Sequence, residues 1–545
     1  MQQRTASESH FLRLHPFVPF NTRRAIMRFL SSLFCITLTV FLSPASSSLA
    51  QQYDLVVING RVIDPETMLD ETLNVGVKDG KIVAITKDDI RGKESIDAAG
   101  HVVAPGFIDT HSHVVTTPFG QKLSLRDGVT TPLELEAGVL PVGQWYASME
   151  GKSQTNYGAS ASLEGAREMV LNPNYKTVNG AIVNDLQEAT ATHLSMAFSK
   201  AVATDEQVQE ILDLVEDGLK QGSLGIGYTP GYMVRGARTE EGIGAQKLAG
   251  KYGRFVSMHG RFSGQQPPND GLTGTLQQLG AAEAYGGGLI ICHMTAQTLA
   301  QTDEALRLID AAARRGIPVV AEIYGYTYGA TIVAADYLEP DNYQNNMGRD
   351  YKDIINTATL EPLTKETYEQ LVKEAPATNV TFENATKRDL YLALSHPTTI
   401  IGSDAYPALS KADGSFAKDW DTPFDSVNAH PRAAGTHARI LRLVREENLM
   451  PLMLAISKMT YMPAKFLQEN GVPQMANKGR IQLGKDADLT IFDPATVKDN
   501  STPQMGGLPS TGIPYVVVNG TIVVKDSKVL KDVYPGQPIR AEVRP

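Results

Sequence analysis

The chain has 545 residues, 42% of them hydrophobic and 20% charged, so it can bury a large core and exceeds the size of one ordinary domain. Its formal net charge of −10 at pH 7 leaves no basic stripe to neutralise phosphates, which argues against a nucleic-acid partner. Only two cysteines are present, and Cys35 lies inside an apolar N-terminal run. We therefore expect Cys292 to be the single thiol of the mature protein, without a disulfide.

Residues 1–50 read as a secretory signal region. Arginines precede the apolar run 29–42, and small residues follow it up to a predicted cut before Gln51. Met27 would begin a signal of ordinary length, so we interpret it as the true start. The run falls short of the ~20 apolar residues of a membrane span, which favours cleavage over an uncleaved anchor. Export without disulfides suits a bacterial periplasm, so we expect a periplasmic or secreted protein with no stable membrane span after cleavage.

Both ends of the chain show the pattern of β-hairpins. Short β-branched runs broken by Asn-Gly and Asp-Gly turns occupy residues 53–97, and the same pattern returns in residues 484–524. We therefore predict one small β-sandwich domain built from residues 51–103 and 471–545.

The middle of the chain, residues 104–470, alternates strand-like runs with helical stretches, which is typical of a parallel sheet covered by helices. Eight such runs predict an α/β fold of the (β/α)8 TIM-barrel type, with its chemistry at the carboxyl ends of the strands. The longest insertion, residues 331–396, is either a lid over the barrel mouth or a surface helix with a long linker. The eight runs are residues 102–113, 128–136, 156–162, 223–228, 254–259, 288–293, 317–324 and 398–404.

Metal-binding residue types end several of these runs. His111 and His113 are spaced i, i+2, so both imidazoles point to the same side of an extended strand, and neutral imidazole binds cations such as zinc. The other candidates end the second, fifth, sixth and eighth runs and are Glu136, His259, His293 and Asp404. Because the carboxyl ends of barrel strands meet on one face, these six side chains predict a centre for one or two divalent ions. Cys292 precedes His293, and strand alternation turns it to the other face, so we interpret it as a packing residue.

Four motifs add a family resemblance that extends over residues 53–525. They are Pro105-Gly106-Phe107-Ile108-Asp109-Thr110-His111-Ser112-His113, Ile401-Gly402-Ser403-Asp404, His430-Pro431-Arg432 followed by Gly435-Thr436, and Gly484-Lys485-Asp486-Ala487-Asp488-Leu489. With these motifs the chain resembles the amidohydrolase superfamily, and within it the N-acyl-D-amino-acid deacylase (D-aminoacylase) group. The resemblance implies zinc, a β-sandwich beside the barrel, and hydrolysis of a linear amide bond.

The chain departs from that group at several positions. The group usually carries a cysteine ligand after its second strand, whereas Glu136 stands here and would bridge two metals, with Glu134 on the same face as the alternative. The group's His-His-Lys after strand six reads His293-Met294-Thr295 here, so its substrate-binding lysine is missing, and Glu164 replaces a histidine near strand three. The fourth run, residues 223–228, contains no lysine, which argues against the lysine-bridged centres of cyclic amidases such as dihydroorotases and hydantoinases. The substrate therefore need not be the usual one of the group.

The resemblance also implies roles for the site residues. The metal ligands would divide into His111, His113 and Asp404 for one ion, His259 and His293 for the other, and Glu136 as the bridge. Metal-activated hydroxide would attack the amide carbonyl, Tyr228 would stabilise the oxyanion and contact the substrate, and Asp404 would act as general acid/base. Arg432 would bind a substrate carboxylate through its planar fork, with a structural salt bridge as the alternative. His430 is a further substrate-binding candidate.

These observations predict a zinc-dependent hydrolase that cleaves a linear amide in a small, carboxylate-bearing substrate, either as an N-acyl-(D-)amino acid deacylase or as a dipeptidase. Two alternatives stay open. One is a cyclic amidase or deaminase on the same scaffold, and the other is a non-catalytic periplasmic binding protein that kept the barrel. The acyl group, the amino acid and its stereochemistry, and the oligomeric state are not specified by these residues.

Overall fold

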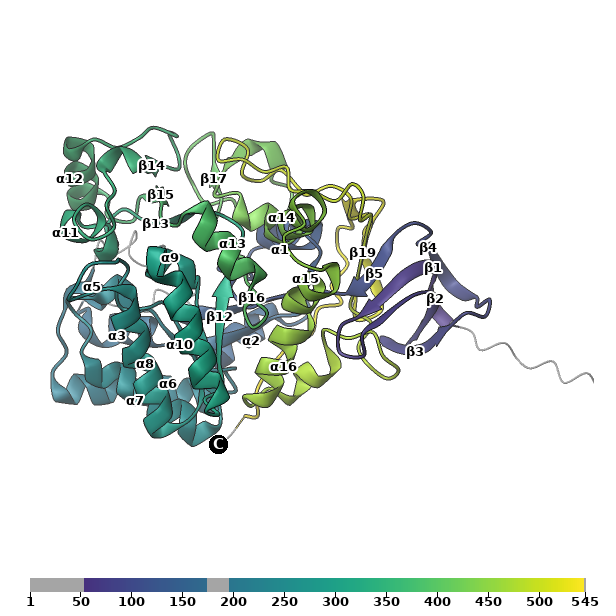
Figure 1. The fold of residues 1–545 in the computed structure, drawn as a ribbon, viewed down its shortest axis with the longest axis horizontal. Helices are drawn as coiled ribbons and strands as arrows, with labels where there is room; N and C mark the ends of the chain where they lie inside the picture. Colours follow the sequence, from purple (N-terminus) through teal and green to yellow (C-terminus); the bar gives the residue numbers. More distant parts are fainter. Residues whose placement is uncertain (1–52, 174–195, 544–545) are drawn as a thin grey trace, which may run out of the picture. The chain divides into compact units, whose positions relative to one another are not determined.

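The computed structural model describes residues 53–173 and 196–543 (Figure 1). The predicted signal region, residues 1–50, lies outside this part of the chain. Within the described ranges, no helix combines the length and the apolar character needed to cross a bilayer. The strands fall into a parallel eight-stranded barrel, a nine-stranded sheet made from both ends of the chain, and two smaller antiparallel sheets.

The barrel consists of eight parallel strands that pair in chain order. They are β6 (Phe107–Asp109), β7 (Val129–Val139), β8 (Gly158–Ser162), β9 (Ile226–Tyr228), β10 (Phe255–Met258), β11 (Gly288–Ile291), β12 (Val319–Ile323) and β16 (Ile400–Ile401). The ring closes just beyond its first and last strands, where Ser112 bridges Ala405 and the His113 amide donates to the Ala405 carbonyl at 2.9 Å. Each of the eight runs expected from the sequence overlaps one of these strands, so the predicted barrel is confirmed.

Helices cover the outside of the barrel because each carries an apolar face of helical period. In α10 (Thr302–Arg314) the buried Leu306 and Ile309 lie three residues apart and share a hydrophobic cluster with Leu289 and Ile291 of β11. The other helices of eight residues or more around the barrel are α1 (Pro118–Arg126), α2 (Val142–Met149), α3 (Leu163–Leu171), α6 (Asp205–Lys220), α7 (Thr239–Tyr252), α8 (Gly271–Tyr285), α13 (Lys387–Ser395), α14 (Arg432–Glu447), α15 (Leu452–Met459) and α16 (Tyr461–Glu469).

The nine-stranded sheet joins the two ends of the chain in the order β22-β21-β20-β19-β5-β1-β2-β3, with β4 beside β1. Its strands are β1 (Tyr53–Asp64), β2 (Leu69–Lys78), β3 (Lys81–Thr86), β4 (Gly92–Asp97), β5 (Val102–Pro105), β19 (Leu489–Phe492), β20 (Tyr515–Val518), β21 (Thr521–Lys525) and β22 (Lys528–Val529). Val57, Val75, Val103 and Val517 pack in its common core. The second β-rich unit built from both termini is therefore present.

The run from Val102 to His113 does not form one strand. It divides at Gly106, because β5 pairs with β1 and β19 in the nine-stranded sheet whereas β6 pairs with β7 in the barrel. A Cβ on Gly106 would lie 2.3 Å from Thr130 Oγ1, so only glycine lets the chain pass this close to β7. The division could not be predicted from the apolar pattern, because the residues of β5 and β6 are all buried and read as one continuous apolar run.

The insertion after β12 has an antiparallel sheet of its own, in the order β13-β15-β14. Its elements are β13 (Tyr328–Ile332), α11 (Pro340–Tyr343), β14 (Ile354–Asn356), α12 (Lys365–Glu374) and β15 (Asn379–Glu383). Tyr337, Tyr343 and Phe382 belong to a separate hydrophobic cluster inside this insertion. The helix α13 falls within the expected range 331–396, but it packs in the helical layer of the barrel. A two-stranded sheet, β17 (Leu409–Ser410) with β18 (Val427–Asn428), follows β16.

Candidate metal centre

His111 and His113 lie just beyond β6, with their Nε2 atoms 3.2 Å apart. His111 is fully buried, and His113 is the more open of the two. Both Nε2 atoms face the same two carboxylates. Glu136 Oε2 lies at 3.1 and 3.6 Å from them, and Asp404 Oδ1 at 3.3 and 3.6 Å. Two imidazoles and two carboxylates therefore converge at the carboxyl end of the barrel.

Glu136, on β7, stands between this pair and a second pair of histidines. Its Oε1 lies 2.8 Å from His293 Nε2 and 3.2 Å from His259 Nδ1, whereas its Oε2 faces His111 and His113. His259 follows β10 and His293 follows β11. One carboxylate thus has a histidine pair on each of its oxygens, which is the arrangement of a ligand that bridges two ions.

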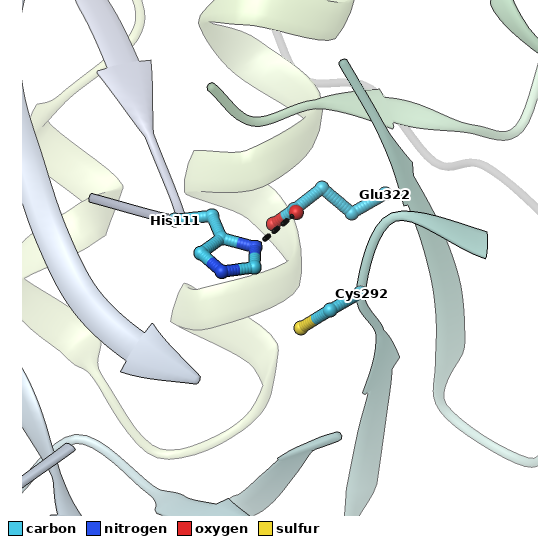
Figure 2. Close-up of side chains that lie close together, drawn as sticks. All are labelled: His111, Cys292 and Glu322. Atoms are coloured by element: carbon cyan, nitrogen blue, oxygen red, sulfur yellow. Dashed lines mark hydrogen bonds and ion pairs between the residues drawn. The ribbon is translucent and has the colours of Figure 1, made fainter. Parts of the chain in front are cut away.

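Glu134 and Glu322 contact the first histidine pair at Nδ1, the ring nitrogen that faces away from the cluster. Glu134 Oε2 lies 2.9 Å from His113 Nδ1, and Glu322 Oε1 lies 2.6 Å from His111 Nδ1, the bond that Figure 2 marks with a dashed line. Glu322 also accepts a bond of 2.7 Å from the Thr110 hydroxyl. A carboxylate in this position holds the ring proton on Nδ1 and leaves the Nε2 lone pair for a metal. The structure thus places Glu136 at the centre of the cluster and Glu134 behind one of its histidines.

Sequence reasoning did not single out Glu322 as a site residue. The signal was available, because Glu322 lies near the carboxyl end of the seventh strand, β12, as the other candidates lie at the ends of theirs. The space for it also depends on a neighbouring strand. A Cβ on Gly402 would lie 2.4 Å from Glu322 Cδ, so the glycine of the Gly402-Ser403-Asp404 motif makes room for this carboxylate.

Cys292 lies beside the His111–Glu322 pair in Figure 2. Its side chain packs in the same cluster as Ile108, Leu135 and Ile290, which come from three barrel strands. His293 adopts a φ of 29°, so the alternation expected from the sequence breaks between the two residues. Burial raises the pKa of the Cys292 thiol far above its ordinary value, and the thiol stays protonated. The His111 nitrogen on this side, Nδ1, is already hydrogen-bonded to Glu322 at 2.6 Å, so it is not available to bind an ion beside Cys292.

The donor set at the barrel mouth suits a divalent ion of the zinc type. Three sets of donor atoms, each within 4.8 Å of one another, combine the six residues as His111, His113 and Glu136, then Glu136, His259 and His293, then His111, His293 and Asp404. Imidazole nitrogen and carboxylate oxygen are common ligands of zinc in proteins. Burial alone would raise the pKa of the Glu136 carboxyl, but the imidazoles of His111 and His293 outweigh it and hold the pKa well below its usual range. The residues therefore fit a metal centre with one or two ions.

Asp404 follows β16 and adopts a φ of 52°, which turns its carboxylate over the barrel mouth. Oδ1 faces the histidines, and Oδ2 forms an ion pair with Arg432 Nη1 at 2.8 Å. Burial would raise the pKa of Asp404, but the Arg432 guanidinium and the His111 imidazole hold it below its usual range. Arg432 is itself buried, donates from Nη2 to the Ala330 carbonyl, and lies over the Tyr324 ring. The salt bridge considered for Arg432 is therefore present, and it is made with a candidate metal ligand.

Tyr228 and His430 do not reach this cluster. The Tyr228 hydroxyl accepts a bond from Arg261 at 3.2 Å and lies against Gly242 of α7, because its side chain points from β9 into the helical layer. Both ring nitrogens of His430 are hydrogen-bonded within the protein. Its Nε2 donates to the Tyr328 carbonyl at 2.8 Å, and its Nδ1 accepts from the Arg432 amide at 3.0 Å. His430 therefore holds the start of α14 against the insertion.

Tyr232 occupies the place beside the metal centre that was expected for Tyr228. It lies in the short helical turn η2 (Pro230–Met233), and its ring centroid is 4.7 Å from that of His259. Tyr337 of the insertion contacts both rings: it stacks on His259 at 5.3 Å with the ring planes 21° apart, and lies 5.4 Å from Tyr232. Burial, followed by the neighbouring charges, raises the pKa of Tyr232 well above its ordinary value, so its hydroxyl remains a hydrogen-bond donor.

A narrow cavity of about 20 Å³ adjoins the second histidine pair. Five of the residues around it come from the insertion, which therefore forms one wall above the metal centre: Gly329, Ala330, Tyr337, Met347 and Phe382. The remaining wall includes Tyr232, Tyr324 and Arg432. The insertion thus has the position of a lid, and its wall is apolar and aromatic.

Glu164 lies at the start of α3, directly after β8. It is buried and accepts a hydrogen bond from the Thr229 hydroxyl. Burial, together with the nearby negative charge of Glu136, raises the pKa of the Glu164 carboxyl to about 8 despite that bond. A neutral carboxylic acid therefore stands near the metal centre at pH 7.

Comparisons with known proteins agree with this geometry. The chain matches the amidohydrolase family over residues 94–168 and 175–524. It is 27% identical to the D-aminoacylase of Alcaligenes xylosoxydans xylosoxydans, with 88% of this chain and 96% of the relative covered, and 25% identical to that organism's N-acyl-D-glutamate deacylase, with 87% and 94% covered. The crystal structure of N-acyl-D-glutamate deacylase from Bordetella bronchiseptica, complexed with zinc and a phosphonate inhibitor, has a TM-score of 0.71 at 23% identity, covering 90% of this chain and 100% of the other. The chain therefore belongs to the amidohydrolase family.

Proposed function

We propose that this protein is a zinc-dependent deacylase that hydrolyses the linear amide bond of an N-acyl amino acid, with the D-enantiomer as the favoured substrate. One observation carries the proposal. The Glu136 carboxylate has a histidine pair on each oxygen, with Asp404 on the same cluster, in a chain whose curated relatives are named D-aminoacylase and N-acyl-D-glutamate deacylase. A dipeptide contains the same kind of bond and belongs to the proposed substrate range.

The metal ligands we propose are His111, His113 and Asp404 for one zinc ion, His259 and His293 for a second, and Glu136 between them. A divalent ion bound there supplies Lewis acidity, which polarises a carbonyl and lowers the pKa of a water molecule towards about 7. The chain's own contribution is to hold the ligands in register. Glu322 and Glu134 fix the ring protons of His111 and His113 on Nδ1.

Asp404 is the proposed general acid/base. Arg432 occupies its Oδ2, so Oδ1 is the oxygen that faces the reacting atoms and can accept the proton of the attacking water and pass it to the leaving nitrogen. Such a role is worth roughly 10²–10⁴-fold in rate. The Tyr232 hydroxyl, beside His259, is the proposed donor to the developing oxyanion.

Arg432 also lines the narrow cavity, with its guanidinium plane over Tyr324. Among the described residues that line this cavity, it is the only one with a permanent positive charge. A carboxylate that enters a partly dry site needs a cation beside it, so we place the substrate carboxylate next to Arg432. Thr295, which stands where the related group has a lysine, is buried and uncharged.

Export from the cytoplasm is part of the proposal. It is supported by the arginines, the apolar run 29–42 and the small residues before Gln51. Mass spectrometry of the protein recovered from the periplasm or medium of a bacterial host should find a mature chain that begins near Gln51. A chain that retains the run 29–42 would contradict this.

The deciding experiment is a hydrolysis screen of the zinc-loaded protein over N-acyl-D- and N-acyl-L-amino acids, dipeptides and hydantoins. We expect turnover of linear N-acyl amino acids, lost by at least about 10²-fold in Asp404→Asn, which keeps the shape but cannot move the proton. Turnover confined to the cyclic substrates would favour the cyclic amidase instead. Substrate binding without turnover, in a protein that carries its metal, would favour a binding protein.

A further inference from the structure

A second cavity, of about 280 Å³, borders the first histidine pair. We call it the His113 cavity. It lies between the start of α1 and the segment that follows Asp404, and its lining residues are His113, Val114, Thr116, Thr117, Pro118, Phe119, Gly120, Leu123, Pro407, Ala408, Phe416, Ala417 and Lys418. Among the described residues, this cavity shares no lining residue with the narrow cavity beside His259 and His293.

The His113 cavity borders the metal centre through His113, the one candidate ligand among the described residues of its lining. The side chain of His113 is 16% exposed, whereas those of His111, His259 and His293 are 0%, 6% and 5% exposed, so His113 is the most open of the four imidazoles. The next residue, Val114, packs against Ala405, which follows Asp404 in the chain. A group held beside His113 at the metal centre is therefore next to this cavity.

The lining of the His113 cavity is apolar where it is deepest. Val114, Phe119, Leu123 and Ala408 are all buried, and none of the described residues that line the cavity carries a carboxylate. Ala408 and Ala417 lie side by side on one wall, where the amide of Ala417 donates to the carbonyl of Ala408 at 2.9 Å. Their side chains are small, so each leaves space that a larger residue would fill. Lys418, the one lysine or arginine of the described lining, is exposed.

An amide substrate has two sides, and the centre borders two cavities of different chemistry. The narrow aromatic cavity holds Arg432 and has room for a small group, whereas the His113 cavity is apolar and an order of magnitude larger. A cavity of this size has room for an alkyl chain several carbons longer than acetyl. We propose that the His113 cavity is the acyl subsite and that it selects a straight, medium-length apolar acyl chain. This inference rests on the proposed deacylase function.

The test is a series of N-acyl derivatives of one D-amino acid, from acetyl to dodecanoyl, assayed with the zinc-loaded full-length protein. We expect kcat/KM to rise about three- to fourfold for each added methylene, as burial of apolar surface requires, and to fall once the chain outgrows the cavity. Ala417→Phe fills the cavity from its partly exposed wall and should lower the octanoyl-to-acetyl ratio of kcat/KM by at least about 10-fold. Ala408→Leu should do the same from the buried wall.

Ala84→Phe is the matched control. It adds the same bulk at a partly buried alanine of β3 that lines neither cavity of the metal centre, and should leave the ratio unchanged. A second readout needs no turnover. The free carboxylic acids from acetate to decanoate should raise the Tm of the zinc-loaded protein increasingly with chain length, and Ala417→Phe should abolish that trend.

The outcomes separate the two proposals. Hydrolysis of acetyl substrates with a flat chain-length profile, unchanged in both cavity variants, would overturn the acyl subsite and leave the deacylase function standing. The absence of hydrolysis for every N-acyl amino acid would overturn the deacylase function. In that case a chain-length trend in Tm that Ala417→Phe removes would still assign the cavity to an apolar chain, and the absence of such a trend would overturn the cavity assignment too.

Discussion

Arg432 and Asp404 form a buried ion pair, in which Nη1 of the guanidinium lies 2.8 Å from Oδ2 of the carboxylate. Because Oδ2 is occupied, the other oxygen, Oδ1, is the one that faces His111 and His113. The pair joins the first residue of α14 to the loop beyond the eighth strand, β16, which ends at Ile401. Arg432 therefore orients the proposed general acid/base, whatever it does to a substrate.

The first prediction concerns the double role of Arg432. Arg432→Met should lower kcat by at least about 10-fold on both an N-acyl-D-amino acid and its amide analogue, because a buried carboxylate loses its partner. If Arg432 also binds the substrate carboxylate, KM on the acid should rise by a further ~10-fold while KM on the amide stays unchanged. Steady-state kinetics on the two substrates measure both effects.

Arg432→Lys keeps the charge without the planar fork and serves as the comparison. It should recover part of the loss in kcat. An unchanged kcat for Arg432→Met on the amide would contradict the orienting role, and equal KM changes on the two substrates would contradict the carboxylate contact.

The second prediction separates the two glutamates of β7. Glu136→Gln should reduce the zinc content of the purified protein from about two ions to one or none, because the bridging carboxylate is lost. Glu134→Gln should keep both ions at saturating zinc and only weaken their binding, since Glu134 contacts His113 at Nδ1, the nitrogen away from the metal. Elemental analysis of both variants is the measurement. The reverse result would assign the bridge to Glu134.

The third prediction concerns Glu322, which is fully buried against His111. Glu322→Gln keeps the size of the side chain but weakens its hold on the ring proton, so the affinity for zinc should fall about 10–100-fold. Competition with a chromogenic chelator gives the affinity, and the Tm of the metal-free variant reports the fold. A large drop in that Tm with an unchanged zinc affinity would make Glu322 a packing residue.

The fourth prediction compares two tyrosines that lie four residues apart. Tyr232→Phe should lower kcat by about 10²-fold with a smaller change in KM, because the hydroxyl beside His259 is the proposed oxyanion donor. Tyr228→Phe should leave kcat near normal and lower the Tm slightly, since its hydroxyl bonds Arg261 below α7. A kcat loss confined to Tyr228→Phe would return the oxyanion role to Tyr228.

Residues at the ends of barrel strands could be predicted from the sequence because the fold itself gathers them. His111, Glu136, His259 and Asp404 needed only the assignment of strands and the rule that parallel strands end on one face. The errors arose where the backbone leaves regular geometry. A φ of 29° at His293 broke the alternation that was expected to turn Cys292 away from the barrel interior.

Contacts between distant segments were the second source of error. Glu322 contacts His111 although more than 200 residues separate them in the chain, and Gly402 makes room for the Glu322 side chain. Neither contact can be predicted from a local sequence pattern. Tyr228 was expected at the site from the family resemblance, yet the turn that follows β9 places Tyr232 there. The lining of the two cavities likewise depends on how the insertion and the segment after Asp404 pack, not on periodicity.

The fifth prediction follows from the raised pKa of Glu164, about 8 in the folded protein. In the unfolded chain a glutamate has a pKa near 4.3, so between pH ~4.3 and ~8 the folded state binds more protons at this site than the unfolded state. The free energy of unfolding therefore falls as pH rises through that window, by at most about 1.4 kcal/mol per pH unit, and the effect levels off above pH ~8. Glu164→Gln cannot titrate and should remove this loss.

Urea titrations of the metal-free protein at pH 5 and pH 8 test this. The stability of Glu164→Gln relative to the unsubstituted protein should increase between these pH values by about 2–4 kcal/mol. Glu240→Gln, at an exposed glutamate of α7, is the control and should show no comparable increase. If the difference between Glu164→Gln and the unsubstituted protein is the same at both pH values, Glu164 is already ionised at pH 5. Glu164 would then be a negatively charged carboxylate near Glu136, and not a neutral acid.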